Sequence, residues 1–394
     1  MSAGRPFAGW AWGDSGGLLM PLVSVVIPNW NGKQLLPTCL ASIRAQTLPG
    51  AEIIVSDDAS TDGSVGLVSQ RYPEVKLIRS PLNRGFAAAA NAGIRASSGD
   101  FVFLLNNDTE LDPHCLRELL CAIQPDDGIG TCATKMVYYD APEVINSAGH
   151  ACGPDGVVMD IGRGQPDGPL FDQPREVLGA CAGAALYRRR MLDEIGLFDE
   201  SFVMSFEDAD LSWRAQWAGW RCRYVPTAVV RHREGSSRGI ASRRSVALGL
   251  RNTILLWVKD WPAASILRHL HDMWRGLRRS MASLIFRGYG GVLPAVLWGV
   301  VSQMPTMLSR RRRIRRRRAV APARFEELVS GSPRDADLTP FDSGLRLGMV
   351  RLVQQACAGA LSLLILLLVL GAAALVDLTE KRADGRRRPP PAKR

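Results

Sequence analysis

The chain has 394 residues, 46% of them hydrophobic and 22% charged, which excludes a disordered protein and leaves room for one large core with an appendage. Its net charge of +11 is uneven, because residues 310–318 read RRRRIRRRR and the stretch after Asp377 carries further Lys and Arg. Such runs favour anionic lipid or nucleic acid as a partner. No zinc-finger or RNA-binding motif accompanies them, so the sequence favours anionic membrane lipids and no nucleic acid.

Residues 1–20 are predicted to be a disordered leader, because they are rich in Gly, Trp and Ala and lack an apolar run of signal-peptide length. A strand-like run starts directly after Met20, which makes Met20 a candidate for the true start. The eight cysteines form no Cys-x-x-Cys pair and no ligand-like cluster with the five histidines. They are interpreted as reduced packing residues of a cytoplasmic chain.

Short apolar runs alternate with helical stretches between residues 21 and 139, and this alternation predicts an α/β fold with a parallel, doubly wound sheet. The expected strands are residues 23–27, 52–56, 75–78 and 101–105. The expected helices are residues 34–46 and an Ala-rich stretch that ends near Ala96. Ligands of an open α/β sheet bind at the carboxyl ends of its strands, and polar clusters of this chain fall at those ends.

Two of these polar clusters have a structural and a functional interpretation. The segment Pro28-Asn29-Trp30-Asn31-Gly32, taken alone, is typical of a strand-to-helix turn. Asp57 either caps a helix together with Ser60 or Thr61, or accepts a hydrogen bond from the N3–H of a pyrimidine base.

Two further turns follow. Arg84-Gly85 allows close approach of backbone to a ligand, although a single Gly is weak evidence. Asn106-Asn107-Asp108 is either an Asx turn or a site for a hard divalent ion that bridges a diphosphate. The chain has no G-x-G-x-x-G and no P-loop, which counts against a dinucleotide or ATP site.

An acidic cluster opens the segment 205–220, SFEDADLSWRAQWAGW, whose apolar residues recur at helical spacing. Ser205 and Asp208 could form a capping box, and the helix dipole favours acids at a helix start in any case. Catalysis by Glu207 and Asp208 is the alternative, and Asp210 is expected to support the helix start.

Seven segments resemble, in their order along the chain, the motifs of glycosyltransferase family 2, above all its bacterial rhamnosyltransferase-like and galactofuranosyltransferase-like members. They are VSVVIPNWNG (23–32), SDDASTDGS (56–64), NRGFAAAANAGI (83–94), LLNNDTEL (104–111), GACAGAALYRR (179–189), IGLFDESFVMSFEDADLSWRAQWAGW (195–220) and RHREGSS (231–237). The resemblance covers roughly residues 21–252, and the ordered series is far more specific than any single segment.

The resemblance implies a GT-A fold and inverting transfer of a sugar from a nucleotide diphosphate donor. It implies that Asp208 is the general base and that Glu207 holds the acceptor or orients Asp208. It assigns a divalent metal, Mn²⁺ or Mg²⁺, to Asp108, Asn106 and His232; Asn106 stands where the family motif begins with an acid, and His232 is otherwise a surface residue of a basic turn. The implied donor-binding residues are Pro28, Asn29, Asn31, Asp57, Arg84, Gly85, Asn107 and Asp108.

Residues 142–177 are rich in Gly, Pro and Asp, which is typical of a hairpin or loop on the acceptor side or of an exposed connector. Beyond the GT-A domain, assigned to residues 21–252, the sequence predicts amphipathic, interfacial helices that end in the Arg run (253–320) and a linker (321–350). An uncharged run from Ala356 to Val376 predicts a transmembrane or membrane-inserted helix at 351–377, followed by a basic tail at 378–394. The apolar stretch 288–308 is interpreted as buried or interfacial. A single span or a shallow hairpin is therefore expected.

Taken together, the sequence predicts a metal-dependent inverting glycosyltransferase on the bacterial cytoplasmic membrane, with its catalytic domain facing the cytoplasm. The expected donor is a dTDP- or UDP-linked sugar such as a rhamnose-like hexose, and the expected acceptor is a lipid-linked or surface-polysaccharide saccharide. The alternatives are a processive polysaccharide synthase, disfavoured by the lack of a Gln-x-x-Arg-Trp motif, and a membrane scaffold that binds nucleotide sugar without turnover. A nucleic-acid-binding protein is a third alternative, motivated by the Arg run alone.

Overall fold

The computed structural model describes residues 22–234, 243–330 and 349–384. The predicted leader (1–20), the end of the RHREGSS segment, linker residues 331–348 and tail residues 385–394 lie outside the described residues.

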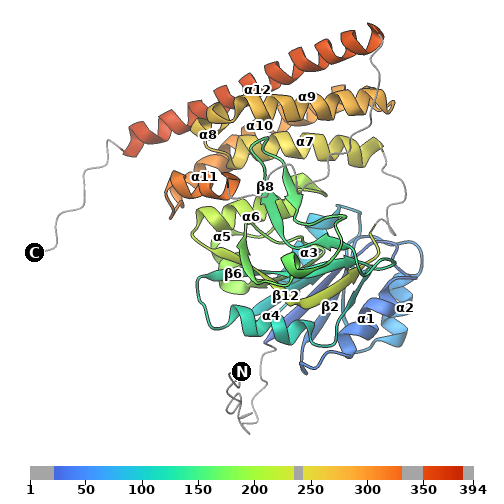
Figure 1. The fold of residues 1–394 in the computed structure, drawn as a ribbon. Coiled ribbons are helices and arrows are strands. Elements are labelled where there is room, and N and C mark those ends of the chain that lie inside the picture. The colour runs from blue at the N-terminus through green and yellow to red at the C-terminus, as the bar shows by residue number, and fades with distance from the viewer. Residues whose placement is uncertain (1–21, 235–242, 331–348, 385–394) are drawn as a thin grey trace, which may run out of the picture.

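A mixed ten-stranded sheet, with the strand order β10-β12-β6-β11-β4-β1-β2-β3 and with β5 and β7 at its side, forms the centre of the molecule (Figure 1). The strands β1 to β4, and also β6 and β12, pair in parallel, whereas β11 runs antiparallel between β4 and β6. The strands are β1 Val23–Asn29, β2 Glu52–Asp57, β3 Lys76–Arg79, β4 Phe101–Leu105, β5 Thr109–Leu111, β6 Ile129–Tyr138, β7 Ile145–Ser147, β10 Arg175–Val177, β11 Ala184–Arg188 and β12 Arg221–His232. A separate hairpin joins β8 His150–Cys152 to β9 Val158–Asp160.

This sheet confirms the predicted α/β class, and all four expected strands exist within two residues of their predicted bounds. The reason is visible in burial, because β1 and β4 are buried along their whole length, as apolar strands covered on both faces must be. The Gly-, Pro- and Asp-rich stretch 142–177 contains the β8–β9 hairpin and short strands.

Helices cover both faces of the sheet. One core packs α1 Leu36–Arg44 and α4 Cys115–Ile123 against it, beside α2 Ser64–Arg71. The opposite core holds α3 Phe86–Ala96, α5 Arg189–Ile195 and α6 Glu207–Trp217, with short 3₁₀ turns at Pro169–Phe171 and Glu200–Phe202. The predicted first helix, 34–46, is two residues shorter at each end, and it begins at Leu36 with Pro37 in its first turn, a position that proline favours.

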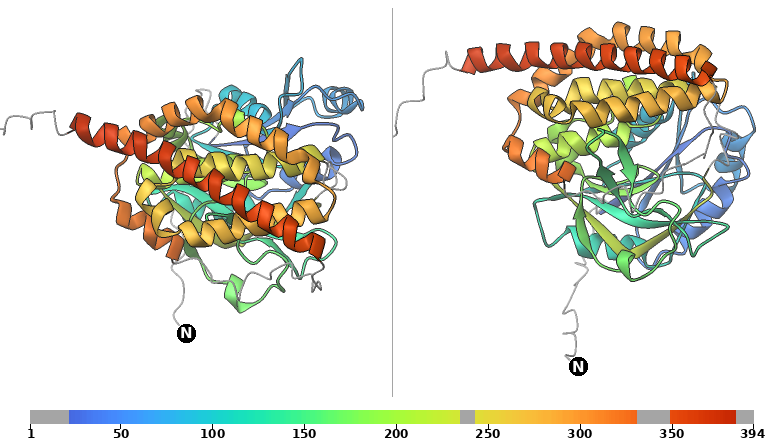
Figure 2. Two further views of the ribbon diagram at one scale, coloured as in Figure 1. Left: turned by 90° about the horizontal axis from the view of Figure 1, so that it is seen from above. Right: turned by 45° about the horizontal axis from the view of Figure 1, so that its top comes forward.

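A third layer of helices lies on α6, on the side away from the sheet (Figure 1, Figure 2). It contains α7 Arg243–Asp260, α8 Ala263–Arg268, α9 Leu270–Phe286, α10 Leu293–Arg316, α11 Pro322–Ser330 and α12 Met349–Asp384, with a 3₁₀ turn at Gly290–Val292. Trp213 and Trp217 of α6 stack on Phe325 of α11. Helix α7 runs through position 252, where the sequence placed the end of the GT-A domain.

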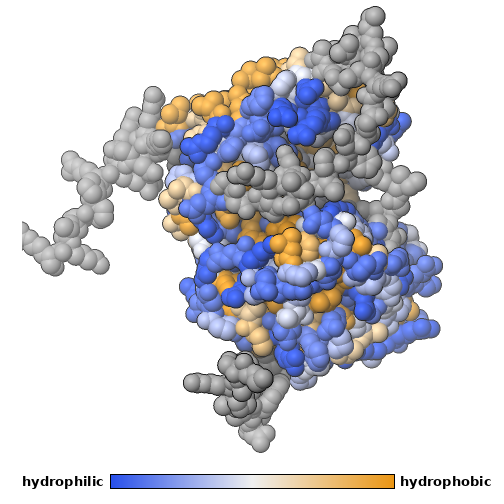
Figure 3. Space-filling view, in the orientation of Figure 1, coloured by the Kyte–Doolittle hydropathy of each residue, from blue (hydrophilic) through white to orange (hydrophobic). Residues whose placement is uncertain are grey.

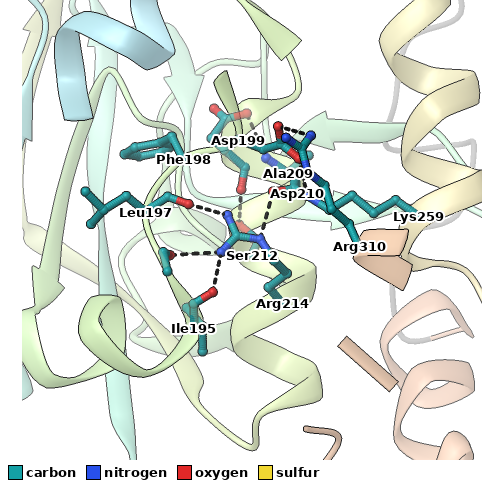
Figure 4. A network of polar contacts seen from close by, with 12 residues as sticks. Ile195, Leu197, Phe198, Asp199, Ala209, Asp210, Ser212, Arg214, Lys259 and Arg310 are labelled. Atoms are coloured by element: carbon teal, nitrogen blue, oxygen red, sulfur yellow. Dashed lines mark hydrogen bonds and ion pairs between the residues drawn. The ribbon is translucent and has the colours of Figure 1, made fainter. Parts of the chain in front are cut away.

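Buried ion pairs join α6 to this helical layer (Figure 4). Lys259 of α7, with 3% of its side chain exposed, pairs with Asp210 of α6 and, at 2.6 Å, with Asp199. Arg310 of α10 contacts the second oxygen of Asp199 at 2.5 Å. Burial raises the pKa of Asp199, but Lys259, Ser201 and Arg310 together outweigh burial and hold that pKa well below its usual value.

Several arginines of the Arg run contact other parts of the chain, which the sequence did not predict, whereas Arg312 and Arg313 are exposed. Arg311 is buried and bonds the carbonyls of Val258 and Trp261 and the carboxylate of Asp377. Two further ion pairs join Arg310 to Asp199 and Arg315 to Asp377. In addition, Arg317 donates to the Glu194 carbonyl, and Arg318 lies over the Trp217 ring.

Lys259→Met tests the buried network. The change leaves two buried carboxylates without their shared cation, so the free energy of unfolding at pH 7 should fall by about 3–5 kcal/mol. In the variant the carboxylates can become neutral by taking up protons. The difference in the free energy of unfolding between wild type and variant should therefore become smaller as the pH falls from 7 through the ordinary range of Asp pKa values. Denaturant titrations at several pH values measure both effects.

Lys76→Met is the matched control, because Lys76 is half exposed and its ion pair with Glu52 spans 3.9 Å. We expect it to cost less than about 1 kcal/mol. An equal loss of unfolding free energy in the two variants would contradict the view that the ion pairs of Lys259 hold α6 to the helical layer.

Candidate functional site

A cavity of about 560 Å³ opens between the carboxyl ends of the strands, the β8–β9 hairpin and the first turn of α7. Five of the predicted site residues line it, namely Asn106, Asp108, Glu207, Asp208 and His232. Apolar side chains of Val158, Met159 and Val246 complete part of its wall. A volume of this size suits a small organic ligand.

The predicted donor residues of β1 and β2 lie at adjoining strand ends and do not line this cavity. Asn29 Nδ2 donates to Asp57 Oδ1 at 2.8 Å, and Asn107 Nδ2 donates to Asn29 Oδ1 at 2.8 Å. Asp57 Oδ2 accepts from the backbone N–H of Ser60 at 2.9 Å, so both of its oxygens already have a partner. Pro28 is buried in β1, beside Ser56 of β2.

The loops that follow β1 and β2 bind each other. The Asn31 backbone N–H donates to Ser60 Oγ, and Asn31 Oδ1 accepts from the N–H of Thr61. Asn31 and Ala59 both adopt positive φ, at 52° and 61°. Non-glycine residues in this region cluster at functional sites, where the surrounding contacts hold the strain.

The Arg84-Gly85 turn is anchored by Asp58, a residue that the sequence did not single out. The Asp58 carboxylate accepts from the backbone N–H groups of both residues, at 2.8–3.1 Å. A Cβ at position 85 would lie 2.6 Å from Val203, and φ there is +91°, so glycine is required for packing against the loop before α6. The Arg84 side chain is mostly exposed and pairs with Glu200 at 2.7 Å.

Asp108 and His232 meet in the cavity although they are far apart in the sequence. His232 Nε2 lies 3.2 Å from Asp108 Oδ1, a buried oxygen that has no hydrogen bond in the described part of the chain. Pairing of β5 with β12 sets this contact, because Thr109 stands opposite His232. Asn106 lines the cavity beside them, and its carbonyl accepts from Thr109 Oγ1.

The orientation of the His232 ring is fixed from behind. Asn146 Nδ2 donates to Glu234 Oε2 at 2.9 Å, which turns Asn146 Oδ1 toward His232 Nδ1 at 3.0 Å. An amide oxygen only accepts, so Nδ1 carries a proton, and in the neutral ring Nε2 presents its lone pair to Asp108.

Asp208 stands in the first turn of α6, with 18% of its side chain exposed toward the cavity. Its oxygens accept from the backbone N–H groups of Ala209 at 2.8 Å and Ala182 at 3.2 Å. The proposed capping box is wrong: the N-cap position is Phe206, no side chain caps the helix, and Ser205 lies outside it. Glu207 beside it is buried at the cavity wall, and Asp210 points away from the cavity and pairs with Arg214 and Lys259.

A second group of side chains, His150, Asp160 and Cys181, lies around Asp208 and was not predicted from the sequence. His150 Nε2 lies 3.7 Å from Asp208 and 3.6 Å from Asp160, its partner across the β8–β9 hairpin. The ligand atoms of His150, Asp160 and Cys181 lie within 4.8 Å of one another, which corrects the expectation that no Cys clusters with a His. Burial, Asp160 and Asp208 raise the pKa of the Cys181 thiol well above its usual value, so it stays a neutral thiol.

The loop that delivers Asp208 is strained and is held from α7. Val203, Ser205 and Phe206 adopt φ of 65°, 67° and 68°, a region that non-glycine residues seldom enter. Asn252, fully buried, donates through Nδ2 to the carbonyls of Phe202, Met204 and Ser205 at 2.8–3.0 Å. No pattern in the sequence signalled this role, because Asn252 stands between the polar residues Arg251 and Thr253.

A family model described as glycosyl transferase family 2 matches residues 24–196. A curated relative from Mycobacterium tuberculosis, N-acetylglucosaminyl-diphospho-decaprenol L-rhamnosyltransferase, is 28% identical over 56% of this chain and 78% of its own length. A pre-mycofactocin glycosyltransferase of the same organism is 30% identical over 53% of this chain and 42% of its own length. The O-antigen biosynthesis protein RfbC of Myxococcus xanthus is 27% identical over 55% of this chain and 18% of its own.

Among solved structures, GalNAc-T7 with UDP, GalNAc and Mn²⁺ aligns with a TM-score of 0.49 at 19% identity, over 61% of this chain and 48% of its own. The mannosyltransferase PcManGT from Pyrobaculum calidifontis, with GDP-Man and Mn²⁺, aligns with a TM-score of 0.45 at 18% identity, over 92% of this chain and 89% of its own. The family match and the motif residues gathered at the strand ends agree with the GT-A class expected from the sequence. The chain is thus a glycosyltransferase, and its residues 24–196 match the model of glycosyl transferase family 2.

Proposed function

We propose that the protein transfers a hexose, rhamnose or a close analogue, with inversion, from a nucleotide diphosphate sugar to a lipid-linked or surface-polysaccharide saccharide. One observation carries the proposal: a single cavity holds the Asp208 carboxylate and the Asp108–His232 pair. Inverting transfer needs a base on the acceptor side and charge stabilisation on the diphosphate side, and this pair of features supplies both.

The residues around Asp108 fit a divalent cation. Asp108 Oδ1 is buried and has no hydrogen bond among the described residues, and a neutral His232 ring with its proton on Nδ1 would turn the Nε2 lone pair toward it at 3.2 Å. Two lone pairs at that distance repel each other unless a proton or a cation lies with them. Asp108, His232 and the amide oxygen of Asn106 would hold Mn²⁺ or Mg²⁺, which offsets charge on a leaving diphosphate.

Asp208 takes the acceptor hydroxyl proton in this proposal. Two backbone N–H groups hold its carboxylate at the cavity edge, and Glu207 beside it contacts or orients the acceptor. The hydroxyl oxygen then attacks the anomeric carbon from the face opposite the diphosphate, which inverts that carbon.

The sugar and the acceptor are inferred from relatives. The Mycobacterium tuberculosis relative is named for L-rhamnose transfer and for N-acetylglucosaminyl-diphospho-decaprenol, a lipid-linked saccharide. We infer a dTDP- or UDP-linked donor, and an acceptor that reaches the cavity past α7 at the cytoplasmic face of a bacterial membrane. The scaffold without turnover remains the competing function, and the experiments below separate it from the enzyme.

A thermal-shift panel tests the donor first. It compares dTDP-rhamnose, UDP-galactose, UDP-glucose, UDP-N-acetylglucosamine and GDP-mannose, with and without Mn²⁺. Stabilisation by one donor that depends on the metal would support the proposed site and identify the sugar. A folded sample stabilised by none of the five would contradict the proposed donor site.

Asp208→Asn should abolish transfer while donor binding persists, because the amide cannot take a proton but keeps the shape of the side chain. We expect transfer to a synthetic N-acetylglucosaminyl-diphospho-polyprenol to fall by about 10²–10⁴-fold. Asp193→Asn, an exposed change on α5, serves as the matched control and should keep full activity. Wild-type turnover by the Asp208 variant would rule Asp208 out as the base.

Asp108→Ala should instead weaken donor binding, and only where the metal is present. We expect about a tenfold or greater loss of donor affinity in Mn²⁺ and little change in EDTA, measured by calorimetry. Asp127→Ala removes an exposed carboxylate and is the control. A loss of the same size with and without metal would assign Asp108 a structural role.

Asn252→Ala should lower kcat more than donor affinity, because it releases the strained loop before Asp208 from three hydrogen bonds. Thr253→Ala is the control on the next position of α7, where the hydroxyl donates to the Gly249 carbonyl of the same helix. Steady-state kinetics below the melting temperature of each variant separates the two effects. A parallel fall in kcat and donor affinity would indicate general loosening of the fold.

A further inference from the structure

Helix α12 has two different faces. Its inner face packs into the helical layer and buries Ala358, Ser362, Ile365, Leu366, Val369, Ala373 and Val376. Its outer face exposes six leucines to between 43% and 60%: Leu363, Leu364, Leu367, Leu368, Leu375 and Leu378. At 100° per residue these two sets lie on opposite sides of the helix.

Specific polar contacts fix the inner face to the layer. Trp274 Nε1 of α9 donates to the Gly359 carbonyl at 3.0 Å. At the other end, Asp377 accepts from Arg311 at 2.8 and 2.9 Å and from the backbone N–H of Ala263 at 3.1 Å, and it also pairs with Arg315. Arg311 is 2% exposed, so removal of α12 would leave a buried guanidinium without its carboxylate.

These contacts favour a packed position of α12 over a position in which it crosses a membrane. Two segments, Gly290–Arg316 and Ala358–Thr379, are long and apolar enough to cross a bilayer by length and composition. A bilayer-spanning α12 would have to leave α9 and give up the Asp377 ion pairs, at the cost that accompanies breaking a buried pair. The packed position, in contrast, keeps every one of these contacts and still exposes an apolar face.

The surroundings of the exposed face indicate what covers it. Trp298 and Val301 of α10 are exposed to 73% and 59%, and Figure 3 shows apolar side chains gathered along this edge of the molecule. Arg275 and Arg279 of α9 and Arg312 and Arg313 of α10 are exposed in the same layer. Exposed leucines and exposed guanidinium groups within one helical layer match an anionic lipid surface, where apolar side chains enter the acyl boundary and arginines contact phosphates.

We propose that the helical layer lies flat on an anionic membrane surface, with the outer face of α12 inserted at the acyl boundary and with no span across the bilayer. Figure 2, seen from above, shows α12 lying lengthwise across the other helices, as such a placement requires. The inference concerns attachment alone and stands whether or not Asp208 is a base.

The side on which the C-terminus lies distinguishes a flat helix from a span. The full chain with a C-terminal epitope tag is expressed in bacteria, and antibody access is compared in spheroplasts and in sealed inverted membrane vesicles. We expect access to the tag and to the catalytic domain in inverted vesicles only. A tag reached in spheroplasts and shielded in inverted vesicles would overturn the proposal.

The double variant Leu367→Ser/Leu368→Ser tests the lipid contact. We expect its flotation with vesicles of phosphatidylcholine and 30% phosphatidylglycerol to fall by about tenfold or more, since two exposed leucines no longer enter lipid. Leu82→Ser/Leu170→Ser removes as much exposed apolar surface from the catalytic domain and should float like wild type.

Two results would contradict a lipid partner. The outer-face variant could float like wild type although its melting temperature is unchanged. Alternatively, it could convert a dimer to a monomer in light scattering while its flotation stays normal, and the face would then bind a second copy of the chain.

Discussion

The ion pairs of Lys259 with Asp199 and Asp210 are the interaction on which the rest of the structure depends. Asp210 lies two residues after the proposed base on α6, Lys259 belongs to α7, and Asp199 receives Arg310 from α10. Burial and the nearby Asp210 raise the pKa of Asp260 well above its usual value, which favours the uncharged form of this neighbour. Because unpaired charges are costly in such a site, Lys259 and Arg310 of the helical layer stabilise α6 in its observed position.

The strained loop before α6 follows from the same arrangement. Residues at positive φ cost free energy that other contacts must offset. Here the contacts come from Asn252, about two turns before Lys259 on α7, and from the backbone of Val203 against Gly85. The geometry of Asp208 is therefore set by a helix outside the part of the chain that matches the family model, which ends at residue 196.

The sequence predicted the α/β class and the first four strands because each of these features depends on the local pattern of apolar residues. It also singled out Asp108, His232 and Asp208 as candidates, since their motifs follow the strands in a known order, and the fold brings these three residues to one cavity. It could not identify Asp58, His150 or Asn252, because their roles depend on contacts over 26 to 58 residues of sequence. For the same reason it could not predict the partners of Arg310 and Arg311 within the chain, because Asp199 and Asp377 lie far from the Arg run in sequence.

Helix α7 connects the cavity to the helical layer. Its first turns place Ser245 and Val246 in the cavity wall, its middle supplies Asn252 to the loop before α6, and its end supplies Lys259. The same helix packs against α10 and α12, the helices that carry the exposed apolar side chains. A layer resting on lipid would thus hold one wall of the cavity at a fixed height above the membrane. An acceptor anchored in that membrane would need to reach only past this wall, which gives a physical reason for building catalytic support and lipid contact into one helical layer.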